Sequence, residues 1–221
     1  MPTFTQEEAS EYDSRITRLI PGYDLLHSST AAQLSATLGD NAHILVVGSG
    51  TGKEIAELAK INSTWRFTAQ DISTDMLNIG QQRFSDLGIS ERVNVHAGDI
   101  ADFSEPVDAA LCLFVMHFLP DNGDKKDMLK AIAKQLKPQS NLYLADLMRP
   151  ETSFERDAQF SLCQQLGLTD IGVERMKHNF EHEFYPLDRI RLADLLDETD
   201  FSVGKLYFKA LGFSGYVTHK R

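Results

Sequence analysis

One glycine-rich stretch, residues 43–58, constrains the fold of this chain more than any other part of the sequence. It reads HILVVGSGTGKEIAEL: five residues rich in β-branched types lead into alternating glycines, and apolar residues at helical spacing follow. The pattern predicts a buried parallel strand, a tight turn and a helix. Glycines let a ligand approach the backbone closely, and the free N–H groups at the start of a helix attract negative charge. The stretch therefore predicts a nucleotide-type binding site.

The glycine spacing separates this turn from two other nucleotide-binding loops. A dinucleotide fingerprint places its third glycine three residues after the second, and that position holds Lys53 here. A phosphate loop of the Walker type needs Ser or Thr after its lysine, where this chain has Glu54. The order G-x-G-x-G with an acidic residue after it resembles the first motif of class I S-adenosylmethionine (SAM)-dependent methyltransferases. A glycine-rich turn with a purely structural role is the alternative.

A carboxylate follows the next predicted strand, residues 65–70. Asp71 stands where dinucleotide-binding folds place an acidic residue that accepts both ribose hydroxyls. One charged acceptor with two oxygens matches a vicinal diol, so we expect Asp71 to hold a ribose. Its alternative role is a helix N-cap, but Ser73 is better placed to cap the helix predicted over 74–87.

A second acidic residue follows the short strand predicted over 93–96. Asp99 is placed to accept a hydrogen bond from an adenine amine, and Ile100 offers an apolar surface to the ring. An ordinary Gly-Asp turn is the alternative at this position.

The rest of the chain alternates helical and strand patterns. Two helices interrupted by Pro21-Gly22 are predicted over 5–38, the first beginning with a capping box of Thr5 and Glu8. The other predicted elements are a strand over 107–118, a helix over 124–136, a strand over 141–148, helices over 153–166, 170–184 and 187–196, and strands over 205–211 and 213–218. The last two strands are joined at Gly212, so we expect them to be antiparallel.

This order of elements resembles the class I methyltransferase fold. The resemblance implies an α/β fold: a Rossmann-like seven-stranded mixed sheet whose last strand is antiparallel, with helices on both faces, an N-terminal helical lid and a helical insertion after the fifth strand. One domain over 1–221 is expected, made of N-terminal helices (1–38), a SAM-binding core (39–148), an insertion that covers the substrate (149–186) and a C-terminal helix with two strands (187–221). Covering a sheet edge is the alternative role for the N-terminal helices.

Composition limits the possible partners. The net charge of −10 argues against general nucleic-acid binding, which needs clustered Lys and Arg. Cys112 and Cys163 match no metal-binding spacing, and the i, i+4 pair His178 and His182 lacks a further ligand, so no metal is predicted. The longest apolar run, 109–119, is too short for a membrane span, and the charged start is unlike a signal peptide. We expect a cytoplasmic protein without a membrane partner, and a homodimer stays open.

The resemblance also assigns roles to individual residues. It implies that Gly48, Ser49, Gly50 and Gly52 border the methionine part of SAM, that Asp71 holds the ribose, and that Asp99 with Ile100 holds the adenine. Tyr12 and Tyr23 are expected to face the cationic sulfonium, and Ile72, Met76, Leu113 and Phe114 complete the expected cofactor set. On the acceptor side, Arg175, His117 and Asp146 are candidates; His117 is a candidate general base, with a polar wall residue as its alternative role.

A closer resemblance reaches outside the core. Arg18-Leu19-Ile20-Pro21-Gly22-Tyr23, the pair Phe118-Leu119, and Phe208, Gly212-Phe213 and Val217 in the tail are similar to the carboxy-SAM synthase family. That family acts in tRNA wobble-uridine modification, and in it an arginine matching Arg175 binds the extra carboxylate, while the tyrosine matching Tyr23 contacts the cofactor. The chain departs from the family at Ser49, where the family has cysteine, at Gly50, where it has no glycine, and at Leu113, where it has asparagine.

These departures favour a methyltransferase that uses SAM, with S-adenosylhomocysteine (SAH) as its product, and transfers a methyl group to a small-molecule acceptor. A carboxy-SAM synthase-like enzyme is the runner-up. A non-catalytic SAM-binding protein and a nicotinamide oxidoreductase are the alternatives from other classes, and the glycine spacing disfavours the second.

Overall fold

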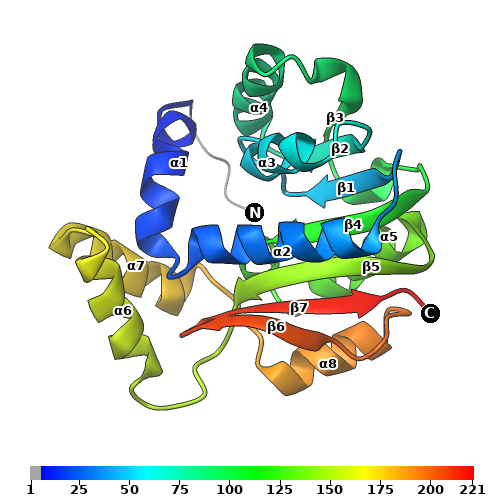
Figure 1. Cartoon of the computed structure of the whole chain (residues 1–221). Coiled ribbons are helices and arrows are strands. Elements are labelled where there is room, and N and C mark those ends of the chain that lie inside the picture. Colours follow the sequence, from blue (N-terminus) through cyan, green and yellow to red (C-terminus); the bar gives the residue numbers. More distant parts are fainter. Residues whose placement is uncertain (1–5) are drawn as a thin grey trace.

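A seven-stranded sheet in the order β3-β2-β1-β4-β5-β7-β6 forms the centre of the computed structural model, which describes the backbone of residues 6–221 and the side chains from Glu11 onward (Figure 1). The strands are β1 His43–Val47, β2 Arg66–Asp71, β3 Val93–Ala97, β4 Val107–Leu113, β5 Leu136–Leu147, β6 Lys205–Ala210 and β7 Phe213–His219. Strands β1 to β5 pair in parallel, and β7 is antiparallel to both β5 and β6. The predicted mixed sheet with an antiparallel last strand is therefore confirmed.

Helices cover both faces of this sheet. They are α1 Gln6–Leu19, α2 Tyr23–Thr37, α3 Lys53–Ile61, α4 Thr74–Asp86, α5 Asp124–Gln135, α6 Glu155–Gln165, α7 Asp170–His182 and α8 Arg189–Asp197, with short 3-10 turns at Ser90–Arg92, Ile100–Asp102 and Met116–Phe118. The N-terminal pair and the two insertion helices agree with the predicted ranges to within a few residues. The predicted capping box at Thr5 lies outside the described residues.

All five residues of strand β1 are buried, which explains why four of them are apolar and why the fifth, His43, forms a hydrogen bond with Thr68 (2.9 Å). Ile44 and Val46 pack into the core that α2, α3 and α4 cover, together with Leu26 and Ile55. Leu45 lies in the core on the opposite face, under α5 and α8. A strand buried on both faces holds the glycine turn that follows it in a fixed position.

The order of strands places a crevice at one end of the sheet. Chain order reverses at β1, which lies between β2 and β4, and in open α/β sheets ligands bind outside the carboxyl ends of the strands at such a point. Helix α1 stands beside α6 and α7 at this end (Figure 1). The thiol of Cys163 on α6 contacts the carbonyl of Leu19 at the end of α1, 3.4 Å away, so the N-terminal helices and the insertion meet.

Two predicted boundaries are wrong. The fourth strand ends at Leu113 and does not continue to Phe118, because Phe114 has a positive φ of 63° and turns the chain away; its N–H instead donates to the carbonyl of Ala145 (2.7 Å). The fifth strand begins at Leu136, which pairs with Val107, before an irregularity leads to the regular register from Asn141. Both deviations depend on pairing between β4 and β5, which the local pattern does not encode.

Candidate active site

The glycine turn after β1 is held open by left-handed backbone conformations. Gly48, Gly50 and Gly52 have φ values of 65°, 52° and 72°. A Cβ at Gly52 would collide with the ring of Phe84 on α4, so this glycine permits close packing of α3 and α4. A Cβ at Gly50 would meet only the Met76 side chain within 3.4 Å (Cε at 3.2 Å) and would otherwise enter open space. Gly50 is thus the glycine of the turn that leaves room for a ligand.

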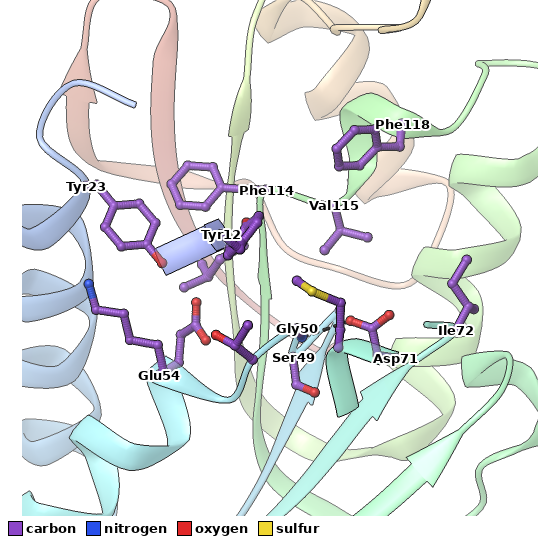
Figure 2. Close-up of a pocket in the computed structure, with 15 residues that line it drawn as sticks. Tyr12, Tyr23, Ser49, Gly50, Glu54, Asp71, Ile72, Phe114, Val115 and Phe118 are labelled. Atoms are coloured by element: carbon purple, nitrogen blue, oxygen red, sulfur yellow. Dashed lines mark hydrogen bonds between the residues drawn. The ribbon is translucent and has the colours of Figure 1, made fainter. Parts of the chain in front are cut away.

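A cavity opens over this turn (Figure 2). It contains about 660 Å³ of space that no atom fills, part of it open to solvent. Its lining consists of Tyr12, Tyr23, Gly48, Ser49, Gly50, Thr51, Lys53, Glu54, Asp71, Ile72, Met76, Leu113, Phe114, Val115 and Phe118. The structure therefore brings together most of the residues predicted to bind the cofactor, from α1, α2, the turn, β2, α4 and β4.

Asp71 is tied directly to the glycine turn. Its Oδ2 accepts a hydrogen bond from the N–H of Gly50 (2.8 Å), and its Oδ1 accepts one from the N–H of Ser73 (2.8 Å). Burial raises the pKa of Asp71, and the backbone hydrogen bonds oppose that rise. Ser73, as expected, is the N-cap of α4 and accepts from the N–H of Met76. Asp71 is therefore free of the capping role and presents its carboxylate to the cavity.

An exposed apolar side chain lies next to this carboxylate. Ile72 is 40% exposed and lines the cavity with Met76. Ile72 is therefore an exposed apolar side chain beside the Asp71 carboxylate.

The side chain of Gln70 supports the glycine turn, a contact that the sequence did not predict. Its Oε1 accepts from the N–H of Gly48 (3.3 Å), and its Nε2 donates to the carbonyl of Gly98 (2.7 Å). It is buried, and it connects the turn after β1 with the turn after β3. The available signal was an amide side chain next to Asp71 at the end of a predicted buried strand.

The turn after β3 does not take part in the cavity lining as predicted. Asp99 is exposed and its Oδ1 accepts from the N–H of Ala101 (2.8 Å), which makes it the N-cap of a 3-10 turn. Ile100 is only 3% exposed and packs into the core below α5, because the 3-10 turn directs it inward. The apolar residue beside the expected adenine position is therefore Ile72, and the role of Asp99 stays a prediction.

Aromatic rings from α1, α2 and the segment directly after β4 form one wall of the cavity. Tyr23 stacks on Phe114, with ring centroids 5.7 Å apart, and the Lys53 ammonium lies 4.6 Å from the Tyr23 centroid. Tyr12 lines the same wall from α1, and burial raises the pKa of both phenols. Neutral phenol rings in this arrangement attract a cation.

Helix α1 is fastened over the turn by polar contacts. The hydroxyl of Thr51 donates to Asp13 on α1 (2.7 Å), and the guanidinium of Arg83 on α4 pairs with Asp13 and donates to Thr51 (3.1 Å). These three side chains connect α1, the turn and α4.

His117 and Asp146, predicted separately, form a buried pair. The Nδ1 of His117 bonds to Oδ1 of Asp146, which also accepts from the N–H of Leu147 (3.0 Å). The imidazole packs against Phe118 and Phe184, with centroids 4.1 and 4.7 Å away. Phe118 lines the cavity, whereas His117 is not part of its lining.

A buried lysine lies near this pair and was missed by the sequence reasoning. The ammonium of Lys125 on α5 donates to the carbonyl of Met116. Burial lowers its pKa, and the negative charge of Asp146 opposes that effect. Its position in a helical pattern alone would have marked it as an exposed residue.

Four other residues singled out in the sequence lie apart from the cavity lining. Gly52 serves helix packing, as described above. Arg175 lies on the exposed side of α7, and its acceptor role stays a prediction. His178 and His182 have rings 4.6 Å apart, but within the described part of the chain no group of three or more His, Cys, Asp or Glu residues is arranged to hold a metal ion.

None of the described helices is long and apolar enough to cross a membrane.

Residues 45–142 match a family model described as a methyltransferase domain. A ubiquinone/menaquinone biosynthesis C-methyltransferase of Pseudomonas syringae is 27% identical over 143 residues, which cover 64% of this chain and 56% of that protein. The carboxy-S-adenosyl-L-methionine synthase of Desulfotalea psychrophila is 19% identical over 224 residues, which cover 98% and 91%. The chain spans 36% to 56% of the length of the first curated relatives that it matches.

A solved structure shares the fold. The magnesium protoporphyrin IX methyltransferase of Synechocystis, determined with bound SAH, superimposes with a TM-score of 0.67 at 17% identity, covering 92% of this chain and 86% of that one. At this identity the likeness shows the arrangement of helices and strands.

Proposed function

We propose that this chain, which carries a class I SAM-dependent methyltransferase domain, moves a methyl group from SAM to a small-molecule acceptor. The observation that carries the proposal is the cavity at the carboxyl ends of β1 and β4, where the glycine turn, Asp71 and an aromatic wall meet. SAM bound there supplies a methyl group already activated by the positive sulfonium. The part of the protein is then to align the acceptor and to exclude water.

The residues of the cavity fit this cofactor. The open space at Gly50 admits a ligand against the backbone, and Asp71 presents a carboxylate for a ribose diol. Ile72 offers an apolar surface to the adenine, while Tyr23 and Phe114 present ring faces suited to a cation. The same contacts suit SAH, the expected product.

A small acceptor is supported by what surrounds the cavity. Helices α1 and α2 and the segment 114–118 enclose it. The net charge of −10 opposes a large polyanionic acceptor, whose binding would need several Lys or Arg contacts to phosphates. At its rim Phe118 packs against Phe184, with centroids 5.2 Å apart, so the acceptor side has an aromatic lining.

The His117–Asp146 pair supports a proton-accepting role. A carboxylate on Nδ1 fixes the tautomer and orientation of the imidazole, and leaves Nε2 to take a proton from an acceptor hydroxyl. We assign this role to His117 with Asp146 as its positioning residue. Phe118 and Phe184 hold the imidazole from two sides.

Calorimetric titration with SAM and SAH, followed by transfer of a labelled methyl group to a panel of hydroxylated small molecules, tests the proposal. Binding of both nucleosides with methyl transfer to at least one acceptor is expected. A folded protein that binds neither nucleoside would overturn the proposal, and binding without turnover across a broad panel would favour the non-catalytic alternative.

A cytoplasmic location and a homodimer also stay predictions. Cell fractionation tests the first, and size-exclusion chromatography tests the second.

The end-to-end match to a carboxy-SAM synthase supports a second candidate. Arg175, the arginine that this candidate needs, is exposed on α7, and the apolar Leu113 lines the cavity where that family has a polar contact. Incubation with SAM and prephenate, followed by mass spectrometry, separates the two. We expect no carboxylated nucleoside; its formation, and its loss in Arg175→Ala, would establish the second candidate instead.

A further inference from the structure

Glu54 is the second carboxylate, besides Asp71, that lines the cavity. It lies in the first turn of α3, directly after the glycine turn, and its side chain is 14% exposed. Figure 2 shows Glu54 and Asp71 on opposite sides of Gly50, with the Glu54 carboxylate directed toward the space below Tyr12 and Tyr23. The cavity therefore has one carboxylate at each side of the glycine turn.

The cations nearest to Glu54 are engaged elsewhere. Lys53 pairs with Asp24 on α2 (3.1 Å) and lies over the Tyr23 ring. Arg83 pairs with Asp13. The charged and titratable groups that surround Glu54 are Tyr12 and Asp13 on α1, Tyr23, Asp24 and His27 on α2, Lys53 and Glu57 on α3, Asp71 on β2, and Arg83 on α4.

The histidine beside Glu54 does not supply the missing charge. The Nε2 of His27 lies 3.6 Å from Oε1 of Glu54 and has no hydrogen-bond partner among the described residues. Burial lowers the pKa of His27 to about 4, so the ring is neutral at pH 7. Burial raises the pKa of Glu54 to about 7 and Asp13 adds to this rise, while a hydrogen bond from its own backbone N–H and the charges of Lys53 and Arg83 oppose it. Among the described residues no Lys or Arg forms an ion pair with this largely buried carboxyl, and the imidazole beside it lacks a hydrogen-bond partner, so the site is costly unless a ligand completes it.

An ammonium group has the charge that would complete this site. It would neutralise the carboxylate, and the phenol rings of Tyr12 and Tyr23 would stabilise its charge. Because Asp71 occupies the ribose side of the turn, the opposite side is left for the amino-acid part of the cofactor. Building on the proposed function, we propose that Glu54 binds the α-ammonium group of SAM and SAH, and that it releases its proton to solvent when either ligand binds.

The coupling between ligand binding and proton release predicts how binding depends on pH. The free protein holds a proton on part of its Glu54 population at pH 7, while the bound form needs the carboxylate. Binding near pH 7 should therefore release roughly half a proton per ligand, rising toward one as the pH falls below 7. The affinity for SAH should weaken as the pH falls below 7.

Two probes and two variants test the proposal. SAH carries the α-ammonium, and 5′-methylthioadenosine has the same nucleoside without the amino-acid part. Glu54→Gln should weaken SAH by roughly 10- to 100-fold, the scale for hydrogen bonds to a charged group, and should leave methylthioadenosine unchanged. Glu57→Gln, one turn further along the same helix, should alter neither. Calorimetry in buffers of different ionisation enthalpy should show proton release in the wild type and none in Glu54→Gln.

Methylthioadenosine binding also certifies that the variant is folded. Equal SAH affinity in Glu54→Gln and wild type, or proton release that persists in the variant, would overturn the role of Glu54 while leaving the proposed function intact. A wild-type protein that binds neither probe would overturn the proposed function and this inference with it.

Discussion

The N–H of Gly50 donates a hydrogen bond of 2.8 Å to Oδ2 of Asp71, so the turn after β1 and the end of β2 form one unit. The second carboxylate oxygen is held by the N–H of Ser73. Each oxygen keeps further acceptor capacity, which a vicinal diol of a ligand can use. The carboxylate is thus oriented before a ligand arrives, and the entropy cost of orienting it does not fall on binding.

Replacing Asp71 tests this arrangement. Asp71→Ala should weaken SAM binding by about 2–3 kcal/mol, the scale for lost hydrogen bonds to a charged group. Asp71→Asn should lose less, because an amide still offers one acceptor oxygen. Calorimetry gives both values, and wild-type affinity in both variants would place the ribose contact elsewhere.

Gly50→Val should abolish SAM binding. A branched side chain there would fill the space next to Met76 and strain a backbone with φ 52°. Gly88→Ala is the matched control, since Gly88 has φ 66° but no atom within 4 Å of an added Cβ. The control should lose about 1 kcal/mol of unfolding free energy and keep its affinity. Unchanged SAM affinity in a folded Gly50→Val protein would contradict the assignment.

Asp13→Ala should accelerate release of SAH, because it frees α1 from Thr51 and Arg83. These side chains are partly exposed, so the loss should be about 1 kcal/mol, or roughly fivefold in the dissociation rate. Stopped-flow displacement measures that rate. Lys126→Met, which removes an ion pair with Glu198 outside the cavity, is the control and should leave it unchanged; equal rates in all three proteins would show that α1 does not gate the site.

His117→Gln should lower kcat by roughly 10²- to 10⁴-fold with SAM affinity retained, if the acceptor carries a proton. Asp146→Asn should do the same and also lower the unfolding free energy, by about 3 kcal/mol, since it removes a buried charge close to Lys125. Turnover against pH separates the two effects. Normal turnover in His117→Gln would show that the histidine has only a structural role.

His27 makes the stability of the protein sensitive to acid. Its pKa is lowered from 6.5 to about 4 in the folded state, so the unfolded chain binds more protons between these values. Neutral His27 contributes roughly 3 kcal/mol to the free energy of unfolding. This contribution is complete above pH 6.5 and is lost as the pH falls toward 4. Glu54, whose pKa is raised, acts in the opposite sense over part of this window.

The difference between wild type and His27→Phe isolates the histidine. Urea unfolding at several pH values should show the wild type losing stability relative to His27→Phe as the pH falls from 6.5 to 4. A constant difference across that range would mean that the histidine is not buried in its neutral form.

Local signals along the sequence determined the order of the elements and the core of the cofactor site. The apolar run of β1, the glycines after it and Asp71 at the end of β2 each depend on neighbours within a few residues, so the pattern predicted them. Ser73 as a helix cap and the hairpin around Gly212 were predicted for the same reason. These features follow from backbone sterics and hydrophobic periodicity, which act over short stretches of chain.

Tertiary structure alone decided which distant side chains meet. Pairing of β5 with β4 brings Asp146 next to His117. Strand β4 ends at Leu113, and the positive φ of the next residue, Phe114, places its ring in the cavity wall. Packing of α1 and α2 over the turn buried Glu54 and raised its pKa, an effect that depends on desolvation by residues far away in the chain. Ile100 lies in the core, and Arg175 is exposed to solvent. The orientation of the turn or helix decides which way each side chain points, and the periodic pattern of the sequence does not determine that orientation.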